Sequence, residues 1–370
     1  TTGAFVTLEG ERYYAIRNVD SMPPFFISLV SDSDHWMFIS STGGLTAGRV
    51  SPETSLFPYI PVDRIHESAL HTGSKTLFRV GLDGAGRHWE PFNREHDHRY
   101  TVDRNLYKST LGNKLLFEEI NHDLQLAFRY RWVTSGDFGF VRQCELENLG
   151  NAVCQVEMLD GLQNILPAGT PRVTQASSSN LVDAYKWSEL DSATGAGFFT
   201  LYSGISDRAE PSESLRANTA FCLGLENSQI LLSADQLDRF RRSEPVAQES
   251  IKRGVRGAYL VNASFQLTSR SSRHWQQVAD IERSQADTVN LLHRLRDPAA
   301  VASAIRRSVD HGSGRLARIV AASDGFQTTA EENVAVHHYA NVLFNVMRGG
   351  TFDNQYQVSA AHFREHVKLF

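Results

Sequence analysis

The chain lacks several features that mark particular classes of protein. It has no run of 18 or more apolar residues, so no segment is expected to span a bilayer as a helix. Its first residues show no basic head followed by a hydrophobic stretch, which argues against a secretory signal. The net charge of −5 gives no electrostatic reason to bind nucleic acid or an anionic membrane. We therefore expect a cytoplasmic protein with no nucleic-acid partner and no membrane partner.

Cysteine is scarce, and the motifs of several enzyme classes are missing. The odd number of cysteines, Cys144, Cys154 and Cys222, has no metal-binding spacing and favours free buried thiols. The glycine-rich stretch "STGGLTAGR" matches neither the phosphate loop nor the dinucleotide fingerprint, which favours a tight turn between strands. The nucleophile elbow GxSxG is absent. We assign no catalytic residue, no metal ligand and no cofactor to this chain.

Short strands dominate the chain from Phe5 to about Arg270. Runs rich in Val, Ile, Phe, Tyr and Thr alternate with Gly, Asn, Asp and Ser, as in "LLFEEINHDLQLAFRYRW" and "FVRQCELENLGNAVCQVEM". Each of these two stretches predicts a hairpin around its turn. In the second hairpin, the residues expected to share a face are Phe140, Cys144, Leu146, Cys154, Val156 and Met158. The length of this region indicates a mainly β fold, a large antiparallel supersandwich.

The pattern changes near residue 271 to one with a helical period. Apolar residues at Trp275, Val278, Ile281, Val289, Leu292 and Leu295 predict a first helix. Pro298 starts a second helix with a stripe of Val301, Ile305 and Val309. A third is expected from Thr329 to Met347, stopped by "RGG", and "AAHFREHVKLF" is typical of a fourth. We expect a sandwich over 1–270, a helical linker over 271–325 and the truncated start of a helical barrel over 326–370.

The stretch "HWEPFNREHDHRY", from His88 to Tyr100, concentrates the candidate site residues. Its histidines suggest zinc, but a proline and flanking arginines disfavour a metal site and favour a polar loop with internal ion pairs. A sugar-facing loop is the third interpretation: Trp89 would stack on a pyranose while Glu90, Asn93 or Asp97 bind its hydroxyls.

Carboxylates that cleave a glycosidic bond must face one site, and the available pairs are not placed for this. Glu118 and Glu119 are adjacent on a strand and therefore point to opposite faces. Glu145 and Glu147 share a face, but the core is expected on the other side of their strand. We interpret these four side chains as solvated surface carboxylates.

The order of features resembles the N-terminal part of a glycoside phosphorylase of glycoside hydrolase family 94, the family of cellobiose, chitobiose and β-1,2-oligoglucan phosphorylases. The stretches that carry the resemblance are "SMPPFFISLVSDSDHWMFISSTGGLTAGRVSPETSLFPY", "HWEPF", "FGFVRQCELENLGNAVCQVEMLDGLQNIL" and "NVLFNVMRGGTFDNQY". The arginine after the glycine-rich turn is Arg49, which the resemblance adds to Trp89, Glu90 and Asn93 as substrate-binding residues. The turn lacks the aromatic residue that family members often carry there.

The resemblance implies a galactose mutarotase-like supersandwich, then linker helices and an (α/α)6 barrel. The intact enzyme would cleave a β-linked gluco-oligosaccharide by inverting phosphorolysis, with inorganic phosphate as co-substrate. Its catalytic aspartate would lie in the missing C-terminal catalytic barrel, beyond Phe370. This chain would supply a cleft edge and the interface of a homodimer. Two alternatives stay open: a stand-alone carbohydrate-binding or interaction protein, and an epimerase using His122, His96 and Glu118 on the sheet.

Overall fold

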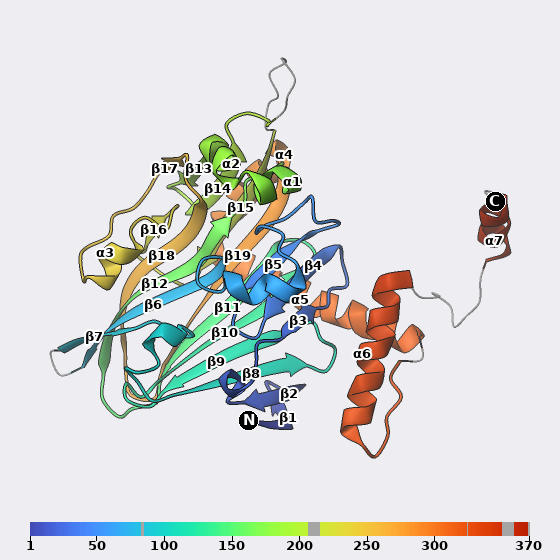
Figure 1. Cartoon of the computed structure of the whole chain (residues 1–370), viewed down its shortest axis with the longest axis horizontal. Helices are drawn as coiled ribbons and strands as arrows, with labels where there is room; N and C mark the ends of the chain where they lie inside the picture. The colour runs from blue at the N-terminus through green and yellow to red at the C-terminus, as the bar shows by residue number, and fades with distance from the viewer. Residues whose placement is uncertain (83–84, 206–214, 324, 350–358, 369–370) are drawn as a thin grey trace.

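A computed structural model describes residues 1–82, 85–205, 215–323, 325–349 and 359–368. Over these ranges the chain forms an 11-stranded, a 5-stranded and a 3-stranded sheet, and every strand pairing within them is antiparallel. Figure 1 shows the large sheet behind the smaller ones, with α6 and α7 to one side. This architecture confirms the predicted mainly β fold of stacked antiparallel sheets.

Neighbouring strands in each sheet are often distant in the sequence. In spatial order, the large sheet contains β1 (Thr2–Leu8), β2 (Glu11–Arg17), β8 (Val102–Ser109), β9 (Leu115–Asn121), β10 (Leu126–Ser135), β11 (Gly139–Asn148), β19 (Ser272–Ser284), β15 (Arg216–Leu223), β14 (Ala196–Leu201), β13 (Lys186–Asp191) and β17 (Ile251–Arg253). The five-stranded sheet contains β16 (Gln229–Leu231), β18 (Gly257–Leu267), β12 (Cys154–Ile165), β6 (Gly73–Leu82) and β7 (Ala85–Trp89). The small sheet contains β3 (Phe26–Leu29), β4 (His35–Ser40) and β5 (Leu45–Arg49).

Helices are short within the sandwich and longer after it. The 3-10 helices are η1 (Val19–Ser21), η2 (Val62–Ser68) and η3 (Arg94–His96). The α-helices are α1 (Arg172–Ser177), α2 (Ser179–Tyr185), α3 (Leu237–Arg241), α4 (Gln285–Leu295), α5 (Pro298–Ala322), α6 (Glu332–Gly349) and α7 (Ala360–Val367). None of the helices in the described ranges is both long and apolar enough to cross a membrane.

The main core lies between the large sheet and the two smaller sheets. Alternate residues along each strand point inward, so Phe128, Trp132 and Phe140 of the large sheet meet Val156 and Met158 of the five-stranded sheet. All five side chains are buried. Each one contributes roughly 1.5–3 kcal/mol of hydrophobic stabilisation, which makes this layer the main source of stability in the sandwich.

One of the two predicted hairpins is correct and the other is wrong. β9 and β10 pair directly across their turn, as expected. β11 and β12 do not pair, because β11 lies between β10 and β19 while β12 lies between β6 and β18 in the other sheet. The Asn148 side chain donates to the carbonyls of Ala152, Leu267 and Thr268, which holds the connection that crosses between the sheets. The expected faces still meet, but across the core.

The helix expected from residue 271 is also wrong over its first half. Residues 272–284 form β19, in the middle of the large sheet. Trp275 and Ile281 face the main core, whereas Val278 faces α4 and α5. Because both faces of β19 are covered, apolar and polar residues do not simply alternate along it. The apolar residues of this strand therefore have a spacing that also fits a helix. The sandwich therefore continues past residue 270 to Ser284, whose capping box with Asp287 starts α4.

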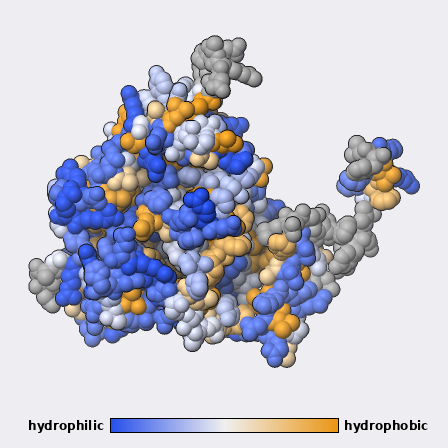
Figure 2. All heavy atoms as spheres, viewed as in Figure 1, coloured by the Kyte–Doolittle hydropathy of each residue, from blue (hydrophilic) through white to orange (hydrophobic). Residues whose placement is uncertain are grey.

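The later helices agree with the sequence. Pro298 begins α5, whose stripe of Val301, Ile305 and Val309 is buried against the outer face of the large sheet. α6 covers most of the predicted third helix, and α7 forms in the last stretch. The second glycine of "RGG", at position 350, lies outside the described residues. Figure 2 shows apolar side chains along the small sheet and on α6, whereas hydrophilic ones cover the face over β6, β7 and α3.

Candidate functional site

Trp89, expected to stack on a sugar, is a core residue. Its indole is 3% exposed and packs against Phe78 with ring centroids 5.3 Å apart. The ring nitrogen donates a 2.7 Å hydrogen bond to Glu119 Oε1. β7 pairs with β6, and this pairing turns Trp89 toward the core. The ring therefore offers no open face to a ligand, unlike the expectation from the sequence.

Glu119 anchors the whole loop that follows Trp89. It is 1% exposed and also accepts from the backbone nitrogen of Phe92 at 2.6 Å and from Arg104 Nε at 2.7 Å. Phe92 has a φ of +62°, a conformation that is rare for a bulky residue and has to be held by its surroundings. Arg104 binds Asp97 as well, at 2.6 Å. The loop is therefore polar, as one interpretation expected, but its carboxylate Asp97 pairs with Arg104 of β8 and not with an arginine of the loop itself.

The adjacent glutamates are not the solvated carboxylates that we expected. Glu118 points away from Glu119, as predicted, but it is only 6% exposed. It accepts hydrogen bonds from Tyr107 and Asn105 and pairs with Arg129 on the outer face of the large sheet. Burial of these two carboxylates is possible because cations and donors surround each of them. Two further carboxylates, those of Glu145 and Glu147, are half-buried and pair with Arg129.

Glu90 and Asn93 lie close together but bind other parts of the chain. Glu90 is buried and forms ion pairs with Lys75 and, at 3.0 Å, with Arg241. Burial raises the pKa of Glu90, but hydrogen bonding to Arg241 and the charge of Lys75 outweigh this and hold the pKa below its usual value. Asn93 caps η3 by accepting from the Glu95 nitrogen. The cavity that they line is about 30 Å³, enough for a water molecule.

Arg49 lies in a different cluster. Its Nε donates to His35 Nε2 at 2.9 Å and lies 3.3 Å from Asp280 Oδ1, and its Nη2 donates to the Gly136 carbonyl at 2.9 Å. Burial, helped by the charge of Arg49, lowers the pKa of His35 to about 3, so the ring is neutral. The structure thus brings Glu90 and Asn93 together and separates both from Arg49.

His35 should make the fold sensitive to mild acid. Its pKa is about 3 when folded and 6.5 when exposed, so the unfolded chain binds the extra proton between these values. Stability is therefore lost as pH falls below 6.5, by up to about 1.4 kcal/mol per pH unit from this group. We expect urea unfolding from about pH 7 to about pH 4.5 to show a shallower loss in His35→Gln than in the native chain. Equal slopes would contradict this assignment.

The remaining candidates do not form a catalytic centre. His122 pairs with Asp103 at 2.9 Å on the outer face, while Glu118 is engaged with Arg129. His96 lies 3.9 Å from Glu90. No group of three His, Cys, Asp or Glu side chains in the described ranges is placed to hold a metal ion. The three cysteines are free thiols.

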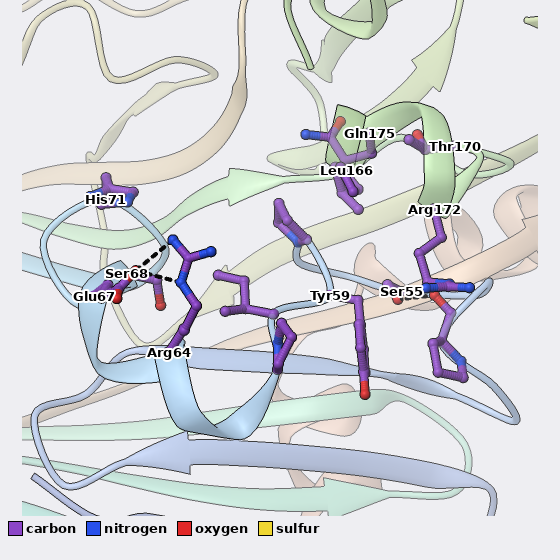
Figure 3. A pocket seen from close by; sticks show the side chains of 15 residues that line it. Ser55, Tyr59, Arg64, Glu67, Ser68, His71, Leu166, Thr170, Arg172 and Gln175 are labelled. Carbon is purple, nitrogen blue, oxygen red and sulfur yellow. Dashed lines mark hydrogen bonds and ion pairs between the residues drawn. The ribbon is translucent and has the colours of Figure 1, made fainter. Parts of the chain in front are cut away.

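A pocket that sequence reasoning missed lies between the proline-rich segment after β5 and helix α1. Its volume is about 340 Å³. Pro52, Pro58 and Pro61 stiffen one wall, and Pro171 precedes α1 on the other. Figure 3 shows Tyr59 between Arg64 on one side and Arg172 on the other, with Gln175 above them. The sequence signal was the short stretch "FPYIP", in which a tyrosine is held between prolines.

Tyr59 is the aromatic surface of this pocket. It is 36% exposed, and Trp36 supports it edge-on with ring centroids 6.0 Å apart. The guanidinium of Arg172 lies 5.9 Å from the Tyr59 ring centre and pairs with Glu53 at 2.8 Å. The phenol ring is thus oriented by its neighbours while part of it stays open to solvent.

Polar groups surround this ring. Arg64 pairs with Glu67 at 2.9 Å, and His71 lines the same wall. Gln175 Oε1 is buried and has no hydrogen-bond partner within the described part of the chain, which leaves a strong acceptor unsatisfied. An apolar ring face with a rim of donors and acceptors suits a polyhydroxylated ligand.

Comparison with known proteins gives weak structural similarities only. No family model matches the chain, and no curated protein matches it. A bacterial glucoamylase complexed with acarbose aligns with a TM-score of 0.42 at 9% identity, over 87% of this chain and 41% of that one. A kojibiose phosphorylase candidate from the human microbiome gives 0.38 at 8% identity, over 72% and 31%. An aldose 1-epimerase candidate from Klebsiella pneumoniae gives 0.32 at 8% identity, over 80% and 91%.

These similarities assign no activity to the chain. It spans about two-fifths of the length of the glucoamylase and about a third of that of the phosphorylase candidate. The resemblance to glycoside hydrolase family 94 stays a prediction.

Proposed function

We propose that this chain is the saccharide-binding β-sandwich part of a carbohydrate-active enzyme, and that the pocket around Tyr59 holds the sugar. The observation that carries the proposal is the partly exposed Tyr59 ring, beside the unsatisfied acceptor of Gln175 in a cavity of about 340 Å³. A pyranose presents an apolar face and a rim of hydroxyls, and this pocket offers a partner for each. The chemistry of bond cleavage is assigned to no residue of this chain.

A β-linked gluco-oligosaccharide is the ligand class that we propose. In β-glucosides the ring substituents lie around the rim, which leaves both ring faces free to stack on an aromatic side chain. The Tyr59 ring would take one face, while Arg64, His71 and Gln175 would bind hydroxyls. The ion pairs of Arg64 and Arg172 are solvent-exposed, and such pairs contribute little, so both guanidinium groups can turn toward a ligand.

The finer proposal is that the intact protein is an inverting β-glucoside phosphorylase related to family 94. Inorganic phosphate would be its co-substrate, and the reacting groups would lie in a C-terminal barrel. In this arrangement the sandwich supplies a cleft edge and the interface of a homodimer. This chain alone should then neither consume nor release phosphate when mixed with β-gluco-oligosaccharides, and measurable turnover would contradict the proposal.

A stand-alone carbohydrate-binding protein is the second candidate. One observation favours it: the lining of the Tyr59 pocket comes from residues 52–71 and 166–176 of the sandwich, and no described residue of helices α4 to α7 takes part. Binding without turnover is expected from both candidates, so the size of the encoded protein distinguishes them.

Tyr59→Ala should weaken binding of a β-linked gluco-oligosaccharide by about tenfold or more, which corresponds to about 1.4 kcal/mol. The variant removes the stacking surface but leaves the arginines in place. Titration calorimetry of the native chain and the variant measures the effect. Tyr202→Ala is the matched control, since Tyr202 is 75% exposed, stacks on Trp187 and does not line the pocket. Equal affinities for the native chain and Tyr59→Ala, or no binding to the native chain, would contradict the proposal.

A further inference from the structure

A second cavity lies where α6 meets the end of the sandwich. Its volume is about 290 Å³, and it shares no lining residue with the Tyr59 pocket. Most of its wall is apolar and comes from β1, β2, β3 and β8 and from the segment just before β3. The apolar and aromatic side chains are Phe5, Tyr14, Ile16, Phe25, Ile27 and Leu106. Helix α6 contributes Val336, His337 and Asn333 to the remaining side.

The amino group of Lys108 stands out in this apolar wall. Along β8, Arg104, Leu106 and Lys108 point to the same face, because side chains alternate along a strand. Arg104 is matched by Glu119 and Asp97. Lys108 has no carboxylate partner in the described part of the chain, and the only other ionisable groups lining the cavity are Tyr14 and His337. Burial lowers the pKa of the Lys108 amine.

The three buried lysines of the described ranges each have a carboxylate partner, whereas the half-buried Lys108 has none. Lys75 pairs with Glu90, Lys114 pairs with Glu11 at 2.6 Å, and Lys186 lies 2.7 Å from Asp183. A half-buried ammonium beside apolar side chains and without a counter-ion is partly desolvated at a cost, and an anion that enters the cavity would reduce that cost. The Lys108 ammonium could therefore pair with one anionic group in the cavity, and the apolar wall leaves room for an apolar group beside that anion.

We propose that this cavity is a binding site for a small organic monocarboxylate with an apolar body. The carboxylate would pair with the Lys108 ammonium, and the aromatic or aliphatic body would pack among Phe5, Tyr14 and Phe25. A cation is disfavoured because no carboxylate lines the cavity within the described residues. Because α6 closes one side, a bound ligand would contact both the sandwich and this helix.

Hydrocinnamate and its neutral amide, hydrocinnamamide, test the charge requirement. By titration calorimetry or ligand-observed NMR, we expect the native chain to bind the acid at least tenfold more tightly than the amide. Lys108→Met keeps the length and apolar stem of the side chain, and it should lose at least tenfold in affinity for the acid. Lys252→Met is the matched control, since Lys252 pairs with Asp235 at 2.8 Å and does not line the cavity. It should bind like the native chain.

The native chain gives a test that needs no variant. The hydrocinnamate carboxylate stays ionised above about pH 6, whereas the Lys108 amine loses its proton at a lower pH than an ordinary lysine. The affinity for the acid should therefore fall as pH rises from about 7 to about 10, and the affinity for the amide should not. Equal affinity for acid and amide, native-like binding by Lys108→Met, or no binding of the acid at millimolar concentration would overturn the proposal.

Unfolding experiments check that Lys108→Met is folded. The pKa of the Lys108 amine is lower in the folded chain than in the unfolded chain. Between these two pKa values the unfolded chain binds more protons, so the native chain becomes more stable as pH rises through this range. Lys108→Met has no such group. We expect this variant to be at least as stable as the native chain near pH 7, with a difference that shrinks toward about pH 10. A less stable Lys108→Met would contradict the view that Lys108 lacks a partner.

Discussion

Replacing Asp160 by leucine should lower the free energy of unfolding by about 3–5 kcal/mol. Asp160 and Arg142 are both completely buried, and Arg142 Nη1 donates to both carboxylate oxygens at 2.9 Å. The carboxylate also accepts from Trp275 Nε1 at 2.7 Å and from Thr76 at 2.6 Å. These residues come from β11, β12, β19 and β6, so one group joins the large and the five-stranded sheets. Removing it leaves the guanidinium charge buried without a counter-ion.

The double variant Arg142→Met/Asp160→Leu separates charge from packing. It removes both partners, so it should recover much of the loss, because apolar replacements for a buried pair are often tolerated. Arg64→Met is the exposed control, since the Arg64–Glu67 pair is solvent-exposed and should change stability by less than about 1 kcal/mol. Urea unfolding measures all three variants. A double variant less stable than Asp160→Leu would contradict this account of the pair.

Glu119→Gln should cost about 3 kcal/mol, the second largest effect that we expect. The substitution keeps the shape of the side chain but removes the negative charge that pairs with Arg104. A glutamine amide has only one acceptor oxygen, so it cannot accept all the hydrogen bonds that Trp89, Phe92 and Arg104 donate to the two carboxylate oxygens. The loop that follows β7 should open more often, since the strained backbone at Phe92 loses its anchor.

Urea unfolding and amide hydrogen exchange together measure this effect. Exchange of the Phe92 amide should accelerate more than the global loss of stability explains. Glu157→Gln is the matched control: Glu157 pairs with Arg79 at 2.7 Å on a more exposed surface, and its loss should be under about 1 kcal/mol. If Glu119→Gln were as stable as Glu157→Gln, the anchoring role of Glu119 would be refuted.

The sequence was sufficient to predict elements with one apolar face and one polar face. β10 alternates aromatic and arginine side chains from Phe128 to Trp132 and pairs with β9 as expected, and α5 shows its buried stripe of Val301, Ile305 and Val309. β19 was misread because sheets and helices bury it on both sides, which erases the period of two. The partner of β11 was misread because a turn signal such as Leu-Gly-Asn does not specify whether the chain returns to the same sheet or crosses to the next one.

The candidate site was harder to predict than the fold. Trp89 has the composition of a sugar-binding residue, but its neighbour across the sheet, Phe78, and the distant Glu119 place it in the core. No local pattern reveals a contact between residues that lie thirty positions apart. Tyr59 was missed for the opposite reason, since it lies in a proline-rich segment without periodicity, and the wall that completes its pocket comes from residues 166–176.

The five tryptophans allow a direct test of where a saccharide binds. Trp36 supports Tyr59, whereas Trp89, Trp132 and Trp275 are buried in the main core. Trp187 stacks on Tyr202, away from the pocket. We expect titration with a β-linked gluco-oligosaccharide to shift the indole NMR signal of Trp36 and to leave the other four in place. A saturable shift of Trp89 or Trp187 with Trp36 unchanged would contradict the assignment of the saccharide site to the Tyr59 pocket.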